Sequence, residues 1–131
     1  MDPKSAYLQG QIETSSPSQQ VVMLYDGLIR FCNEAKQSLS GENGDQLEAG
    51  AQSVKRATDI LTELNSALRH DVFPELCTQL SGLYLFFTEQ LSKAVRENSA
   101  KPIQEILPMI ENLRDSWKQA EEKFQESNKG E

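Results

Sequence analysis

Residues that usually carry catalysis or bind metals are scarce in this chain. Its 131 residues include two cysteines, Cys32 and Cys77, and one histidine, His70. Metal sites in helical bundles often use a Glu-x-x-His pair, but the residue three positions before His70 is Ala67. Both cysteines fall on apolar faces of predicted helices, which favours buried free thiols over a disulfide. We therefore expect a protein that is not an enzyme and that holds no metal and no cofactor.

Basic residues and long apolar runs are also few. The 13 Lys and Arg residues are outnumbered by 20 Asp and Glu, which gives a formal net charge of −7. Phosphate backbones are bound by clustered basic side chains, so this balance argues against nucleic acid as a partner. No window approaches the roughly 18 apolar residues of a membrane span, and the N-terminus lacks a secretory pattern. We expect no membrane insertion and a cytoplasmic location.

The chain does contain four amphipathic stretches separated by three short breaks. Apolar residues recur at three- and four-residue intervals in each stretch, which is the spacing of one helix face. The expected helices cover residues 17–39, 45–68, 72–97 and 102–125. Because short connections favour antiparallel neighbours, the sequence predicts an all-α, antiparallel up-down four-helix bundle. The bundle should span residues 16–126, after a mobile N-terminal arm (1–15) and before a frayed C-terminus (127–131).

Single residues predict how these helices begin, bend and pack. Asp71 is expected to cap the third helix. Pro108 is expected to kink the last helix or to mark the point where it restarts, because proline removes a backbone hydrogen bond. Gly27 interrupts the first helix at a cost of about 1 kcal/mol relative to alanine. It therefore indicates the close approach of another backbone, either from a bundle helix or from a ligand.

The third and fourth helices give the clearest predictions about burial. On the fourth helix, Trp117 and Phe124 should be buried, whereas Glu121 and Glu122 are interpreted as part of a solvated face. The third helix is the most apolar and should be among the most buried. Its core face is predicted to comprise Phe73, Leu76, Cys77, Leu80, Leu83, Tyr84, Phe87, Leu91 and Ala94.

Three features indicate apolar surface beyond that needed for a core. Leu85 and Phe86 lie well over 100° from the core face of the third helix, so they are expected to be exposed and to bind a partner. The alternative is that the third helix is buried nearly all round. Tyr7 and Ile12 are apolar residues in the polar arm, which either binds a partner or only packs on the bundle. Met23, Leu24 and Ile29 widen the apolar surface of the first helix, with core packing as the alternative. Such a scaffold suits the binding of a partner's amphipathic helix in a groove.

Two separated motifs resemble those of a known family. The first is Ser16-Pro17 followed by Met23-Leu24-Tyr25-Asp26-Gly27, with Tyr7, Ile12 and Thr14 upstream; the second is Asn112-Leu113-Arg114-Asp115-Ser116-Trp117. In order and spacing they are similar to motifs of the flagellar secretion chaperone FliS family. The resemblance implies a cytoplasmic export chaperone that binds the disordered C-terminal segment of flagellin. Such a chaperone prevents premature polymerisation and keeps flagellin competent for flagellar type III secretion, with an export-gate component as a further partner.

The resemblance also implies candidate partner-binding residues. Tyr7 and Ile12 match the arm positions of the family, and Leu24, Tyr25 and Asp26 match its first-helix run. Sequence leaves open which of them contact flagellin and which hold the bundle together. The alternative function is a small helical-bundle regulatory adaptor. An adaptor would bind a folded partner, whereas a chaperone needs an unfolded, amphipathic client.

Overall fold

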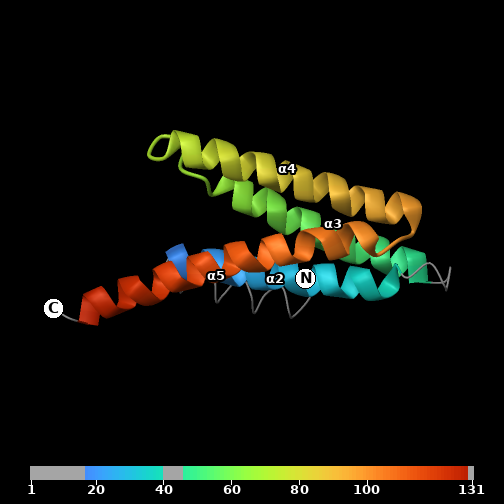
Figure 1. Ribbon diagram of the computed structural model, residues 1–131, viewed down its shortest axis with the longest axis horizontal. Helices are drawn as coiled ribbons and strands as arrows, with labels where there is room; N and C mark the ends of the chain where they lie inside the picture. The colour runs from blue at the N-terminus through green and yellow to red at the C-terminus, as the bar shows by residue number, and fades with distance from the viewer. Residues whose placement is uncertain (1–16, 40–45, 130–131) are drawn as a thin grey trace, which may run out of the picture.

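The protein is an antiparallel bundle of α-helices. The computed structural model describes residues 17–39 and 46–129, and these form four helices without any strand. The helices are α2 (Pro17–Ser38), α3 (Leu47–Ser66), α4 (Pro74–Glu97) and α5 (Lys101–Lys129). Each helix packs against the next, and α5 returns to pack against α2 (Figure 1). The predicted all-α four-helix bundle is confirmed, while the predicted arm lies outside the described residues.

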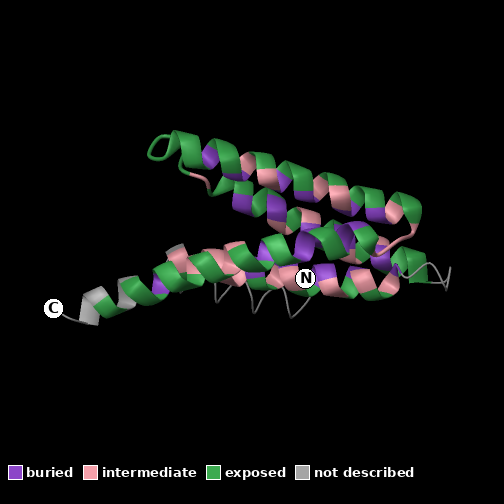
Figure 2. Ribbon diagram, viewed as in Figure 1, coloured by how far each residue is buried: buried purple, intermediate pink, exposed green. Residues whose placement is uncertain are grey.

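One apolar face of each helix contributes to a single core, and α2 is the helix that packs most extensively against its neighbours. Figure 2 shows the buried residues along the inner faces of the helices. Cys32 and Cys77 are buried free thiols, as predicted. Burial raises the pKa of the Cys32 thiol to about 12, because a thiolate is poorly solvated in the core. The thiol therefore stays protonated at neutral pH and is a poor nucleophile.

Two glycines allow α2 and α3 to pack closely. A Cβ atom at Gly50 of α3 would lie 2.6 Å from Leu39 Cδ2 and 2.7 Å from Leu39 Cγ. A Cβ atom at Gly27 of α2 would lie 3.1 Å from Ile60 Cδ1. The close approach predicted at Gly27 therefore comes from a bundle helix, although it is a side chain of α3 rather than its backbone that comes near.

Alanine substitutions at Gly50 and Gly82 are expected to have opposite effects on stability. Gly82 lies in α4, and a Cβ atom there has no described atom within 4 Å, so Gly82→Ala should gain the helix propensity of alanine, about 1 kcal/mol. Gly50→Ala should destabilise the protein by about 1–3 kcal/mol, because the buried Leu39 must move. Urea unfolding of both variants checks this pair. Equal shifts of the urea midpoint in Gly50→Ala and Gly82→Ala would contradict this prediction.

The start of α4 differs from the sequence prediction. Phe73, not Asp71, occupies the N-cap position, and it makes no side-chain capping hydrogen bond. Arg69 instead donates two hydrogen bonds of 3.1 Å to the Asp71 carboxylate. These hydrogen bonds are the main reason that the pKa of Asp71 is lowered. The expectation that Asp71 caps this helix was wrong because a neighbouring cation in the same turn binds its carboxylate.

The first turn of α4 is also more exposed than predicted. Phe73 and Leu76 lie on the same side of the helix as the buried Leu80 and Phe87, yet they are 59% and 49% exposed. Figure 1 shows the reason: the turn between α3 and α4 stands away from α2 and α5. The apolar face of α4 therefore continues past the point where other helices cover it, and the expectation that these two residues join the core was wrong.

Helix α5 is continuous and longer than predicted. It passes through Pro108 and reaches Lys129, so the expected restart at Pro108 does not occur. Trp117 is only partly buried against the core, and the side chain of Phe124 lies outside the described part. Glu121, expected on a solvated face, is 8% exposed and accepts a hydrogen bond from the Ser18 hydroxyl at the start of α2. A polar contact therefore joins α5 to the start of α2 at this end of the bundle.

Candidate binding surface

The exposed apolar side chains gather along one part of the chain. Seven large hydrophobic residues are exposed within the described ranges, and five of them fall between residues 72 and 86. These five are Val72, Phe73, Leu76, Leu85 and Phe86. Exposed apolar side chains concentrated in one segment are typical of an interaction site. The alternative that this helix is buried all round was therefore wrong.

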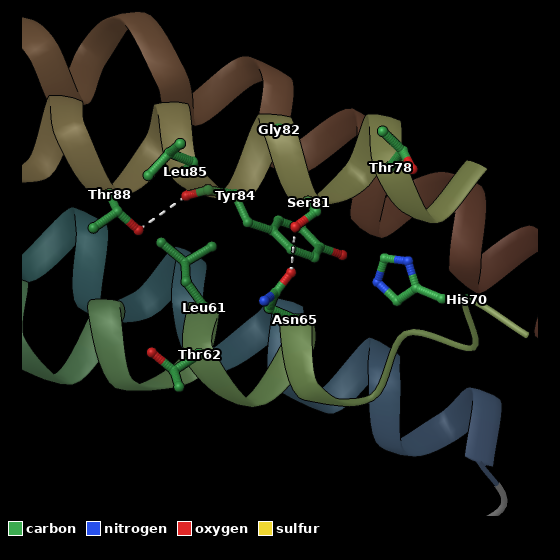
Figure 3. Close-up of a pocket in the computed structure, with 10 residues that line it drawn as sticks. All are labelled: Leu61, Thr62, Asn65, His70, Thr78, Ser81, Gly82, Tyr84, Leu85 and Thr88. Carbon is green, nitrogen blue, oxygen red and sulfur yellow. Dashed lines mark hydrogen bonds between the residues drawn. The ribbon is translucent and has the colours of Figure 1, made fainter. Parts of the chain in front are cut away.

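A groove between α3 and α4 lies beside part of this surface. Its volume is about 510 Å³, and its lining includes Leu61 and Asn65 of α3, and Tyr84 and Leu85 of α4 (Figure 3). Ser81 donates a hydrogen bond of 2.8 Å to the Asn65 side chain. The threonine hydroxyls along the groove donate to carbonyl groups of their own helices. Because these groups already have partners, the groove can accept apolar groups at little desolvation cost.

The two α4 residues predicted to bind a partner are both exposed, but they lie on different flanks of the helix. Leu85 is 61% exposed and lines the groove with α3. Phe86 is 40% exposed, is not among the groove residues and contacts the ring of the buried Phe87 with centroids 6.1 Å apart. Successive residues of a helix point about 100° apart, so a single partner helix in the groove would touch Leu85 and leave Phe86 uncovered.

Tyr25 is the centre of a buried polar contact rather than an exposed residue. It has no exposed surface, and its hydroxyl lies 2.6 Å from the hydroxyl of Tyr84. Burial raises the pKa of Tyr25, the Tyr84 hydroxyl raises it further, and a hydrogen bond with Trp117 acts in the opposite direction. Tyr25 therefore joins α2 to α4 and α5 through the core. Tyr84 also lines the groove, so this contact fixes one of the groove walls.

Removing the Tyr25 hydroxyl should destabilise the fold by about 1–3 kcal/mol, because the buried Tyr84 hydroxyl then loses its partner. Tyr84→Phe should cost less, because the Tyr25 hydroxyl retains its interaction with Trp117. The double variant Tyr25→Phe/Tyr84→Phe should lose less free energy of unfolding than the sum of the losses in the two single variants. Denaturant unfolding of all four proteins measures this coupling, and strictly additive effects would show that the two hydroxyls do not interact.

The other first-helix candidates also contact the rest of the bundle. Asp26 accepts a hydrogen bond of 3.1 Å from Arg114 of α5, which also binds Asp115. Leu24 is partly buried and packs against the core. Since Trp117 meets Tyr25 and Arg114 meets Asp26, the two motifs singled out in the sequence meet in space. Their visible role is to join α2 to α5.

Comparison with known proteins agrees with these motifs. The family profile described as "Flagellar protein FliS" matches residues 1–124. The chain belongs to the FliS family. The flagellar secretion chaperone FliS of Campylobacter jejuni is 35% identical over 115 residues, which is 88% of each chain. The Bacillus subtilis protein of the same name is 30% identical over 119 residues, covering 91% of this chain and 86% of its own. The one from Salmonella typhimurium is 33% identical over 128 residues, 93% of each chain.

Membership of the FliS family places the chain among flagellar secretion chaperones, and the resemblance drawn from the motifs is confirmed. Among the described helices, none is both long and apolar enough to cross a bilayer. The FliS-like arm candidates Tyr7 and Ile12 lie outside the described residues, so they stay predictions.

Sequence reasoning missed part of the candidate surface of this FliS-family chain. Val72, Phe73 and Leu76 were not proposed as partner contacts. The spacing of Phe73 and Leu76 matched the core face, and Val72 was assigned neither to the core nor to the binding surface. The adjacent Arg69-His70-Asp71 break was the available signal, since a helix that begins beside a turn has fewer neighbours to cover its first residues. Gly82 was also missed. A glycine within a helix is usually explained by the close approach of another group, but no described atom lies within 4 Å of a Cβ atom placed at Gly82.

Proposed function

We propose that this chain is a cytoplasmic export chaperone for flagellin. It binds the C-terminal segment of flagellin as helices against the exposed apolar surface on both flanks of α4, which prevents premature polymerisation. It then delivers the subunit to the flagellar export gate. The observation that carries the proposal is the concentration of exposed large apolar residues between Val72 and Phe86 in a member of a secretion-chaperone family.

The surface has the properties that a client helix requires. Leu85 and the adjoining groove offer apolar contact on one flank of α4, while Phe86 offers it on the other. Gly82 leaves open space at the groove, so a client helix can approach the α4 backbone there. A net charge of −7 keeps the protein soluble while this apolar surface is uncovered.

The test is a binding titration with flagellin of the same organism, in full-length form and in a form that lacks the C-terminal helix. The full-length protein should bind, and the truncated form should lose nearly all affinity. Circular dichroism of an isolated C-terminal peptide should show a gain of helix on binding, because the segment folds onto the chaperone. Equal affinity for both forms would contradict the proposal and favour an adaptor that binds a folded partner.

A further inference from the structure

Two arginines of this acidic chain converge on one aromatic ring. Arg30 of α2 lies with its Cζ atom 4.7 Å from the centroid of the Phe31 ring, and Arg56 of α3 lies with its Cζ atom 5.7 Å from the same centroid. The two guanidinium groups are therefore within about 10 Å of each other, across the seam between the two helices. Both arginines are exposed, while Phe31 is buried beneath them.

These two guanidinium groups differ from the other three in the chain. Arg69 and Arg114 bind aspartates, and Arg96 donates to the Ser92 hydroxyl. No carboxylate in the described ranges lies within ion-pair distance of Arg30 or Arg56. The neighbouring Asp59 is paired with Lys55, and Asp26 is paired with Arg114. Two like charges therefore lie near one aromatic ring, and no carboxylate of residues 17–39 and 46–129 forms an ion pair with either of them, although acidic residues are in excess.

We infer that Arg30, Arg56 and Phe31 form a carboxylate-binding site that docks an acidic helix of a partner protein. A guanidinium group that stacks on a ring keeps its N–H edge free to bind a carboxylate. Acidic side chains four residues apart on a helix are about 5–6 Å apart at Cβ, so a pair of them can reach both arginines. The net charge of −7 repels a polyanionic nucleic acid. A protein segment with few negative charges is therefore the favoured partner.

This site is separate from the proposed client surface. It lies on α2 and α3, whereas the exposed apolar residues and the groove belong to α4 and its contact with α3. A partner bound at the arginines therefore leaves Leu85 and Phe86 free. The protein can then hold a client on α4 and an acidic partner on the α2–α3 seam at the same time, and the inference does not depend on the identity of the client.

The experiment uses the full chain and a blocked, alanine-rich helical peptide of about 16 residues as the probe. One peptide carries two Glu residues four positions apart, and its control carries Gln at both. Binding is followed by NMR through the Nε–Hε signals of the arginines at about 20 mM and about 0.5 M salt. The Glu peptide should bind at least fivefold more tightly than the Gln peptide at low salt, shifting the signals of Arg30 and Arg56, and the preference should vanish at high salt.

Matched variants make the test specific. Arg30→Gln/Arg56→Gln should abolish the preference for the Glu peptide, whereas Arg96→Gln should leave it unchanged, because Arg96 lies at the end of α4. Equal binding of both peptides, or shifts in Arg96 instead, would overturn the inference. Binding of free succinate as tightly as the peptide would identify a site for small anions instead of an acidic helix. Binding of a single-stranded oligonucleotide through the same arginines would indicate that the partner is a nucleic acid and not a protein.

Discussion

Phe87→Ala is expected to lower the free energy of unfolding by about 3–5 kcal/mol, whereas Phe86→Ala should lower it by only about 1 kcal/mol. Phe87 has no exposed surface and lies within the core, so its removal leaves a cavity among side chains that cannot close on it. Phe86 is 40% exposed, and much of its ring is already in contact with water. Urea unfolding monitored by circular dichroism measures both changes.

The comparison of these two neighbours contains its own control. They have the same chemistry and the same helix propensity, and they differ in the direction in which the side chain points. A loss of similar size in both variants would mean that Phe86 is buried in solution, for example by another part of the chain. A small loss at Phe87 would mean that the core of α4 is misplaced.

Leu85→Ala/Phe86→Ala should weaken flagellin binding by roughly a hundredfold while leaving the bundle folded. Each substitution should cost about 1–1.5 kcal/mol of binding free energy. Burying a full side chain contributes about 1.5–3 kcal/mol, and each of these side chains is already partly covered, so only its exposed part can be buried by the client. Isothermal titration calorimetry with the C-terminal flagellin segment measures the change. The single variants report the two flanks of α4 separately, since Leu85 lines the groove and Phe86 does not.

The matched control is Leu47→Ala, which removes an exposed apolar side chain from the first residue of α3. It should leave the affinity unchanged. Unchanged affinity in the double variant would exclude this part of α4 from the client site. An equal loss in Leu47→Ala would show that the effect depends on apolar surface in general and not on this position.

The sequence was sufficient to predict the bundle because helical periodicity is a local property. The first and last helices show it best: apolar residues at three- and four-residue intervals placed Tyr25, Leu28 and Cys32 on one face, and Ile103, Ile106 and Ile110 on another, and all six are fully buried. The exposure of Leu85 and Phe86 followed from the same periodicity, because both lie far from the core face of α4.

Periodicity could not show where a helix extends beyond its neighbours. Phe73 and Leu76 fit the core face of α4 by angle, yet they are exposed because the turn before them stands away from α2 and α5. Glu121 shows the opposite case, since a charged residue became buried where the Ser18 hydroxyl was available to bind it. Both outcomes depend on which helices lie next to each other at a given level of the bundle. The spacing of residues within a single helix does not contain this information.

The sequence by itself determined the fold class, the helix faces and the family, because these depend on local spacing and on two motifs. The tertiary structure decided how those motifs act: Tyr25 bonds Tyr84, and Asp26 binds Arg114, so the first-helix run holds the bundle together. It also brought Arg56 of α3 onto the ring of Phe31, which Arg30 already contacts within α2. Such contacts join residues that are remote along the chain, and only the packing of the helices determines which of them meet.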